Sequence, residues 1–217
     1  MGDSMKQEVA EILLRLKAVK VEPKNPFKFT SGLISPIYID NRFVISFPKE
    51  RKLVVKYLSK IIDENKLSFD AIAGVATAGI HWAAWLAEKY EKPMIYIRDK
   101  AKGHGRQNQI EGNLLKGQKV LVIEDHVSTG GSSIAAVLAV REAGAIVDDC
   151  VAMTTYEFPN AKKLFDDEKC RLITLTDFTA IITKAAELGN ITQDEKSIVL
   201  EWNNDAANWA KKHGLDK

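Results

Sequence analysis

One stretch of the sequence combines an acidic pair with a glycine-rich turn. Glu124 and Asp125 follow the apolar residues 120–123 of the expected strand 119–123, and a run of glycines and hydroxylated residues comes next. When a strand leads into a helix through such a turn, the unpaired N–H groups at the helix N-terminus bind phosphate readily, and glycines let the backbone approach the anion. The stretch therefore predicts a phosphate site. Its residues are Ser128, Thr129, Gly130, Gly131 and Ser132.

The acidic pair indicates a different part of the same ligand. Two carboxylates repel a phosphate, but they accept hydrogen bonds from sugar hydroxyls and suit a bound magnesium ion. A strand that ends in two acids also occurs in nucleotide triphosphatases, which need GxxxxGK[ST], but here Gln118 stands where that lysine belongs. No GxGxxG follows a strand, which argues against a dinucleotide site. A polar turn with a capped helix is the structural alternative.

A polar, glycine-rich segment interrupts the pattern between residues 99 and 118. It carries Lys100, Lys102 and His104 close to several glycines. A loop of this length inside a compact domain is typical of a functional lid or of a disordered segment. Cations on a closing lid would neutralise a charged leaving group and exclude water from it. A solvated, charged loop is the alternative.

Short apolar runs alternate with amphipathic segments along much of the chain. This alternation predicts a parallel α/β sheet with right-handed crossovers. The expected strands are residues 37–40, 71–75, 94–97, 119–123, 146–154 and 172–175. The expected helices are residues 6–19, 48–65, 81–90 and 132–143, and a last helix begins at a capping box formed by residues 192–195.

Size and composition are those of an ordinary globular protein. The chain has 217 residues, 46% hydrophobic and 28% charged, which is long enough for one domain with a sizeable core. A formal net charge of +2 creates no basic field for nucleic acid, and no run of about 18 apolar residues predicts a membrane span. The amphipathic N-terminus is not typical of a signal peptide. We therefore expect a cytoplasmic protein that binds neither nucleic acid nor a membrane.

The cysteines and histidines have no spacing typical of a metal site, and the tryptophans are expected to serve in packing. Cys150 and Cys170 lie in apolar runs, so buried, reduced thiols are expected. His81 and Trp82 are expected to pack in the core or at a dimer interface, as is Trp85. His126 lies beside the acidic pair, and the sequence leaves open whether it belongs to the site or faces solvent.

The quoted segments, taken together, are similar to a known family. VLVIEDHVSTGGSS (residues 120–133) resembles the donor-binding motif of the type I phosphoribosyltransferases. Three further segments resemble the orotate phosphoribosyltransferases within that family, and they occur in the family's order and spacing. They are FTSGLISPIYID (29–40), GVATAGI (74–80), and RDKAKGHG with QIEG (98–105 and 109–112).

The resemblance implies a fold and an activity. The fold is the type I phosphoribosyltransferase α/β fold, a central, mostly parallel sheet flanked by helices. Residues 1–217 would form a single domain with a small N-terminal hood of about 1–45 and a mobile lid loop of about 99–112. The activity is Mg²⁺-dependent transfer of a phosphoribosyl group from phosphoribosyl pyrophosphate to orotate. The products are orotidine 5-monophosphate and pyrophosphate, in pyrimidine synthesis.

The resemblance also implies roles for residues that bind the donor. Glu124 and Asp125 would hold the ribose hydroxyls, near a Mg²⁺ that is held mainly by the donor and has no direct protein ligand. Thr129 to Ser132 would hold the 5-phosphate. Lys102, His104 and Asp125 would be catalytic. The donor-binding residues implied are Arg98, Lys102, His104, Glu124, Asp125, Ser128, Thr129, Gly130, Gly131, Ser132, Thr77 and Ala78.

A second set of residues is implied for the base. Ser31 and Gly32 would offer backbone N–H groups to a planar, carboxylated ring, and Tyr38 would lie against it. Ser128 matches a position that touches orotate in this family, and Tyr156 stands where one branch of the family has an arginine for the carboxylate. A Ser-Gly turn followed by a core tyrosine explains the first segment about as well.

Two positions depart from the pattern of one branch of the family, and these departures leave other functions open. Thr30 stands where one branch has a lysine, and Asp99 stands where that branch has a second lid cation. A purine phosphoribosyltransferase is one alternative, against which the IEG sequence and the SGxxSPxY segment argue. A non-catalytic regulator with the same fold is the other, and it predicts a degraded lid or an added DNA-binding unit. The leading hypothesis is the enzyme, as a homodimer whose lid acts on the neighbouring subunit's site.

Overall fold

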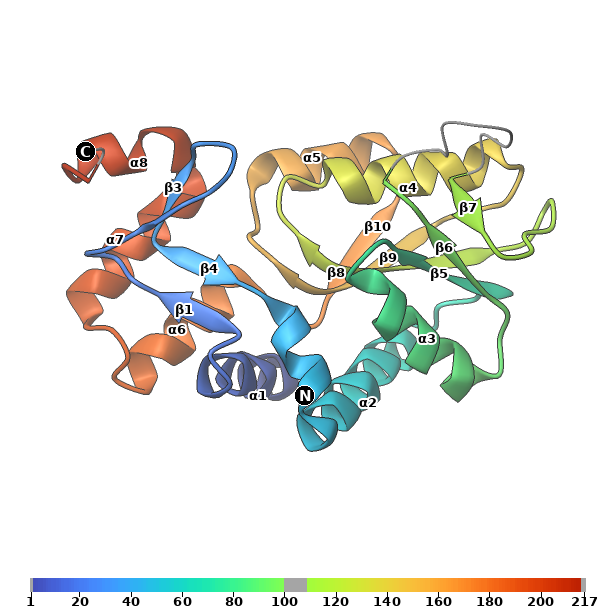
Figure 1. The fold of residues 1–217 in the computed structure, drawn as a ribbon, viewed down its shortest axis with the longest axis horizontal. Helices are drawn as coiled ribbons and strands as arrows, with labels where there is room; N and C mark the ends of the chain where they lie inside the picture. The colour runs from blue at the N-terminus through green and yellow to red at the C-terminus, as the bar shows by residue number, and fades with distance from the viewer. Residues whose placement is uncertain (1, 100–108, 216–217) are drawn as a thin grey trace. The chain divides into compact units, whose positions relative to one another are not determined.

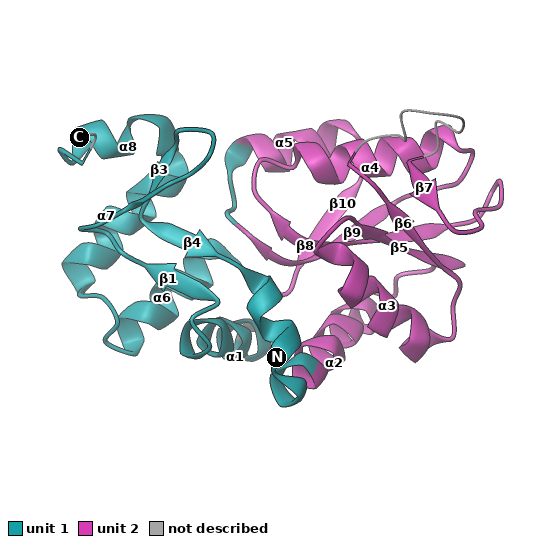
Figure 2. Ribbon diagram, in the orientation of Figure 1, with its two compact units in different colours: residues 1–51, 156–159, 176–217 teal, residues 52–155, 160–175 magenta. Residues whose placement is uncertain are grey.

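The computed structural model describes residues 2–99 and 109–215 (Figure 1). The chain forms two compact units, coloured separately in Figure 2. Unit 1 comprises residues 1–51, 156–159 and 176–217, and unit 2 comprises residues 52–155 and 160–175. Unit 1 thus combines both ends of the chain, while unit 2 is formed by its middle. The expected single domain with an N-terminal hood stays a prediction.

Within the described residues, unit 2 is built on a six-stranded sheet with the strand order β10-β9-β8-β5-β6-β7. The strands from β10 to β6 run parallel, and β7 pairs antiparallel with β6. The predicted mostly parallel sheet is therefore confirmed. The strands are β5 (Ala71–Val75), β6 (Met94–Ile97), β7 (Ile110–Glu111), β8 (Val120–Val127), β9 (Asp149–Thr155) and β10 (Arg171–Thr174).

Helices cover both faces of this sheet. In Figure 1, α4 and α5 lie above the sheet of unit 2, and α2 and α3 lie below it. Because both faces are covered, every residue of β5 is buried, and the strand is a continuous apolar run rather than an alternating one. The helices are α2 (Pro48–Glu64), α3 (Gly79–Tyr90), α4 (Gly131–Glu142) and α5 (Pro159–Asp167).

Two glycines let α3 lie directly against the middle of the sheet. A Cβ at Gly79 would lie 2.5 Å from the carbonyl oxygen of Ile123 on β8, and a Cβ at Gly74 would lie 2.8 Å from the Cα of Ile80. Any side chain at either position would therefore force α3 away from β5 and β8. The loop between β5 and α3 is held beside β8 for this reason.

In unit 1, short antiparallel strand pairs are accompanied by helices from both ends of the chain. β1 pairs with β4, β2 pairs with β3, and α6 packs against both α1 and α7. The elements are α1 (Gly2–Arg15), β1 (Val19–Val21), β2 (Phe27–Lys28), β3 (Ile34–Ser35), β4 (Ile37–Ile39), the 3-10 helix η1 (Asn41–Ser46), α6 (Phe178–Glu187), α7 (Gln193–Asn204) and α8 (Ala206–Lys212). Across residues 2–99 and 109–215, no helix combines the length and apolarity needed to cross a membrane.

Trp202 of α7 lies at the centre of an aromatic cluster in unit 1. It is fully buried, and its ring centroid lies 5.2 Å from that of Tyr156, 5.1 Å from Phe158 and 5.8 Å from Phe178. Its indole N–H donates a hydrogen bond to the carbonyl oxygen of Ile34, at 3.0 Å. α7 thereby joins segments of unit 1 that are far apart in the sequence.

Most predicted elements of unit 2 are confirmed, and β5 and β6 have the predicted bounds. Several predicted ends were wrong. The first helix begins at Gly2 rather than at residue 6, and β9 begins at Asp149 rather than at residue 146. The first helix ends at Arg15 rather than at residue 19, because Lys17 has a left-handed φ of 57° and Val19 begins β1. β8 continues to Val127, because its parallel pairing with β9 extends through His126 and Val127.

Other expectations concern the cysteines and the C-terminal third. Cys150 and Cys170 are free and buried, as predicted. Burial raises the pKa of both thiols, that of Cys170 to about 11. The capping box is confirmed, with Thr192 and Glu195 bonding each other's backbone N–H groups at the start of α7. Elements that the sequence did not predict are the helices α5, α6 and α8 and the short strands β1, β2, β3 and β7.

We expect Gly79→Ala to lower the free energy of unfolding by roughly 1–3 kcal/mol, because the added methyl group must displace the Ile123 carbonyl group. In an ordinary helix the same substitution raises stability, so the sign of the change tests the close approach. Urea unfolding measures it. Gly131→Ala is the control, since the nearest atom to its Cβ would be 4.0 Å away. Equal stabilities of the two variants would contradict the argument.

Candidate active site

The acidic pair lies inside β8 rather than after its end. Glu124 and Asp125 are the fifth and sixth residues of this eight-residue strand, and each is 7% exposed. Because side chains alternate along a strand, the two carboxylates lie on opposite faces of the sheet. Glu124 accepts a hydrogen bond from Ser133 Oγ of α4, at 3.0 Å. Asp125 accepts one from the indole N–H of Trp82 on α3, at 2.8 Å.

Burial changes the protonation of Glu124. Its removal from water raises its pKa from 4.5 to about 7, although hydrogen bonds from the Asp125 N–H and from Ser133 favour the charged form. The neighbouring Asp125 raises the pKa slightly further. A carboxyl group in this state gains a full negative charge once a cation or hydroxyl donors come close to it.

The phosphate cradle has the geometry that the sequence predicts. Gly130 precedes α4 with a left-handed φ of 83°, and α4 begins at Gly131. A Cβ at Gly130 would have ordinary contacts of 3.4 Å with Phe165, so glycine is needed here for its conformation rather than for space. Thr129 and Ser132 are exposed beside the first N–H groups of the helix. This helix start can accept an anion.

A second loop lies at the same edge of the sheet. β5 and β8 are parallel neighbours, so the residues after β5 lie near the end of β8. They include Thr77, which is exposed, and Ala78, and the Ala76–Thr77 peptide bond is cis. A cavity of about 150 Å³ lies at this edge. Its walls include Val75, Ile97, Arg98, Asp99 and Ser132.

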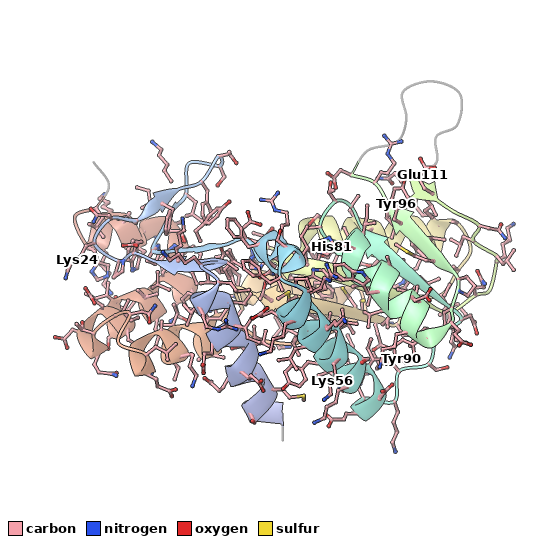
Figure 3. All side chains as sticks on the ribbon, turned by 60° about the horizontal axis from the view of Figure 1, so that its bottom comes forward. Lys24, Lys56, His81, Tyr90, Tyr96 and Glu111 are labelled. Atoms are coloured by element: carbon pink, nitrogen blue, oxygen red, sulfur yellow. The ribbon has the colours of Figure 1, made fainter. Side chains whose placement is uncertain are left out.

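Of the predicted lid, only the two flanks are described. Figure 3 shows Tyr96 and Glu111 on the neighbouring strands β6 and β7, which pair in register. Arg98 lies between these strands and the lid, with its Nη1 3.5 Å from Glu111 Oε1 and its N–H bonded to the carbonyl of Gln109. The predicted catalytic residues Lys102 and His104 lie outside the described residues.

The predicted base-binding residues of unit 1 divide into exposed and buried ones. Ser31 and Gly32 are exposed in the turn between β2 and β3, where Gly32 has a φ of 87° and donates its N–H to the Phe29 carbonyl. Tyr38 is 39% exposed and lies against Phe29 at 6.4 Å. Tyr156 is 4% exposed and packs in the aromatic cluster, so its contact with a base stays a prediction.

Two further candidate residues, His126 and Ser128, lie in β8 and directly after it. Ser128 is half-buried at the start of the cradle, in unit 2. His126 does not face solvent as a loop residue would. It belongs to β8, its Nδ1 lies 2.8 Å from Thr154 Oγ1 on β9, and burial lowers its pKa to about 4. His126 is therefore neutral at physiological pH.

Comparisons with known proteins agree with this geometry. Residues 47–185 match the model of the phosphoribosyl transferase domain family. The orotate phosphoribosyltransferase of Coxiella burnetii is 47% identical over 202 residues, which cover 93% of this chain and 97% of that protein. The chain belongs to the orotate phosphoribosyltransferase family.

Solved structures give the same result for the fold. The crystal structure of orotate phosphoribosyltransferase from Aeropyrum pernix matches with a TM-score of 0.74 and 29% identity, over 85% of this chain and 99% of that one. The Leishmania donovani UMP synthase matches with a TM-score of 0.77 and 26% identity over 92% of this chain, which spans 42% of that longer protein. The type I phosphoribosyltransferase fold is therefore confirmed.

The sequence did not predict the side chains that form hydrogen bonds to the acidic pair and to the segment at Tyr156. Trp82 was expected to be packing alone, and its burial confirms packing, but it also binds Asp125. Ser133 was not singled out. Asn203 donates to the carbonyl oxygens of Tyr156 and Glu157, at 3.0 and 3.4 Å. Hydrophobic periodicity carries no information about such bonds, because they join segments far apart in the chain.

We expect Glu124→Gln to remove a pH dependence of stability. In the wild type, unfolded Glu124 ionises near pH 4.5 and folded Glu124 near pH 7, so the free energy of unfolding falls as pH rises through this window. The 2.5-unit difference corresponds to about 3 kcal/mol. The stability of the variant relative to wild type should therefore rise by up to about 3 kcal/mol between pH 4 and pH 8.

Urea unfolding without donor or magnesium measures this difference. Glu142→Gln, at an exposed position on α4, serves as the matched control. If the free energies of unfolding of Glu124→Gln and the wild type changed in parallel with pH, folding would not shift the pKa of the Glu124 carboxyl group.

Proposed function

We propose that this chain transfers the 5-phosphoribosyl group of phosphoribosyl pyrophosphate to orotate, giving orotidine 5-monophosphate and pyrophosphate in pyrimidine synthesis. The observation that carries the proposal is the edge of the sheet in unit 2. There one strand, β8, supplies both a buried acidic pair and a glycine cradle at a helix N-terminus. The near full-length similarity to orotate phosphoribosyltransferases supports orotate as the base.

Each part of the donor has a matching part of unit 2. The 5-phosphate suits the backbone N–H groups and hydroxyls from Ser128 to Ser132. The ribose hydroxyls suit Glu124 and Asp125 as hydrogen-bond acceptors. The pyrophosphate suits the exposed loop at Thr77 and Ala78 beside β8. These assignments follow the family resemblance and the placement of the loops at one edge.

Magnesium is proposed as the cofactor. Among residues 2–99 and 109–215, no group of three His, Cys, Asp or Glu side chains lies together as a metal cage. The oxygen-only pair of Glu124 and Asp125 fits an ion that keeps most of its ligands from elsewhere, as Mg²⁺ commonly does with phosphate oxygens. When bound, Mg²⁺ would offset charge on the pyrophosphate.

The lid residues are proposed to act on the leaving group. Breaking the C1–O bond places a positive charge on the ribose ring and negative charge on the departing pyrophosphate. Arg98, Lys102 and His104 would stabilise that negative charge, because preorganised cations act most strongly where water is excluded. Asp125, near the ribose, would stabilise the positive centre. We also propose a homodimer in which the lid reaches the neighbouring subunit's site.

The base is proposed to bind through the exposed residues of unit 1. The ring of Tyr38 offers an aromatic face, and the turn at Ser31 and Gly32 offers polar groups to a carboxylate. Tyr156 would support this segment indirectly, because its ring packs against that of Phe29 with a centroid distance of 6.5 Å. The cytoplasmic location stays a prediction.

A spectrophotometric assay tests the proposed reaction. We expect consumption of orotate in the presence of phosphoribosyl pyrophosphate and Mg²⁺, and none with uracil, adenine or hypoxanthine. Removal of Mg²⁺ with a chelator should abolish turnover. Turnover of a purine base instead, or donor binding without turnover of any base, would overturn the proposal.

Lys102→Ala tests the lid in the same assay. We expect kcat to fall by about 100-fold, the size of effect seen when one charge-stabilising group is lost. Lys92→Ala is the matched control, because Lys92 is an exposed lysine at the end of α3. If both variants kept wild-type rates, residue 102 would have no catalytic role.

A further inference from the structure

Trp82 makes a contact that its packing role does not require. Its side chain is fully buried at the sheet-facing side of α3, and its indole N–H donates to Asp125 Oδ1 at 2.8 Å. Asp125 is itself 7% exposed. A hydrogen bond from a neutral donor to a buried carboxylate is one of the stronger polar contacts in a protein. In unit 2, Asp125 is therefore held in place by a hydrogen bond from Trp82.

The backbone of unit 2 enforces this contact. α3 can approach β8 only because Gly79 has no side chain, since a Cβ there would lie 2.5 Å from the Ile123 carbonyl oxygen. Trp82 is three residues further along α3, one turn from this contact point. The rings of His81 and Trp85 lie at 4.8 and 5.3 Å from the Trp82 ring and limit its rotation. The indole is thus held in one orientation.

The other face of the sheet repeats the arrangement. Ser133, in the first turn of α4, is 1% exposed and donates its hydroxyl to Glu124 Oε2 at 3.0 Å. Each acid of β8 is therefore tied to the helix that covers its own face. Each bond satisfies a carboxylate that the sheet and its covering helix remove from water.

We infer that Trp82 is a positioning residue for the donor. Its indole N–H fixes the plane of the Asp125 carboxylate, so that this acid meets the ribose hydroxyls of phosphoribosyl pyrophosphate in one orientation. The inference rests on the proposed function. It differs from a packing role, because packing depends on the size of the ring, whereas positioning depends on the N–H group.

Trp82→Phe separates the two roles, since it removes the N–H group and keeps a large aromatic ring. We expect the Kd and KM for phosphoribosyl pyrophosphate to rise about tenfold. The KM for orotate should stay within about twofold. The kcat should also fall, because Asp125 is proposed to stabilise the positive charge of the transition state as well as to hold the ribose hydroxyls. Trp209→Phe is the matched control, because it also removes a buried indole N–H group, which donates to the Ile198 carbonyl in unit 1, and it should leave all constants within about twofold.

A double-mutant cycle with Asp125→Asn links the effect to its partner. Donor affinity with Mg²⁺ is measured by titration calorimetry for the wild type, both single variants and the double variant. If Trp82 acts through Asp125, the tenfold loss from Trp82→Phe should nearly vanish in the Asp125→Asn background. A penalty of the same size in both backgrounds would overturn the inference and leave Trp82 a packing residue.

The indole N–H signal provides a measurement that needs no Trp82 variant. Among the four tryptophan indole signals of ¹⁵N-labelled protein, one should move upfield in Asp125→Asn and also shift when phosphoribosyl pyrophosphate and Mg²⁺ are added. If no single signal responds to both changes, the inference fails. This inference alone would be overturned if the wild-type protein turns over orotate and Trp82→Phe has the same Kd and KM for phosphoribosyl pyrophosphate. Wild-type protein that binds no donor would overturn the proposed function and this inference with it.

Discussion

Two carboxylates on consecutive residues of a central strand, each buried on its own face of the sheet, are the constraint on which unit 2 depends. An ionised carboxyl group removed from water is costly unless hydrogen bonds satisfy it. Glu124 and Asp125 meet this requirement through groups on α4 and α3, on opposite faces of the sheet. The raised pKa of Glu124 shows that the compensation is incomplete. A site in this state is stabilised by a ligand that brings hydroxyl groups or a cation.

The same constraint explains the glycines around the strand. α3 must touch β8 for an indole to reach Asp125, and this contact requires Gly79 to lack a side chain. α4 must begin directly after β8 for Ser133 to reach Glu124, and this start requires the left-handed conformation of Gly130. The phosphate cradle and the acidic pair are therefore one structural unit, because the same short segment of backbone determines both.

Unit 1 shows how the C-terminal third of the chain supports the base segment. Trp202 and Asn203 are neighbours on α7, and they donate to the carbonyl groups of Ile34 and Tyr156. These bonds connect α7 with β3 and with the segment after β9. The turn between β2 and β3 stays exposed, as a ligand-binding turn must. The strand that follows this turn is thus held by a helix of which the sequence predicts only the capping box.

The family, the mostly parallel sheet and the loops that carry the site could all be predicted from the amino-acid sequence. Short-range patterns encode these features, because strands, glycine turns and the acidic pair are each contiguous in the chain. The tertiary structure alone shows that β8 continues past the acids, that His126 is half-buried within this strand, and which side chains hold each carboxylate. Those facts depend on contacts between residues such as Trp82 and Asp125, which lie 43 positions apart. Local propensity contains no term for such pairs, so they emerge only when the sheet and its covering helices are assembled.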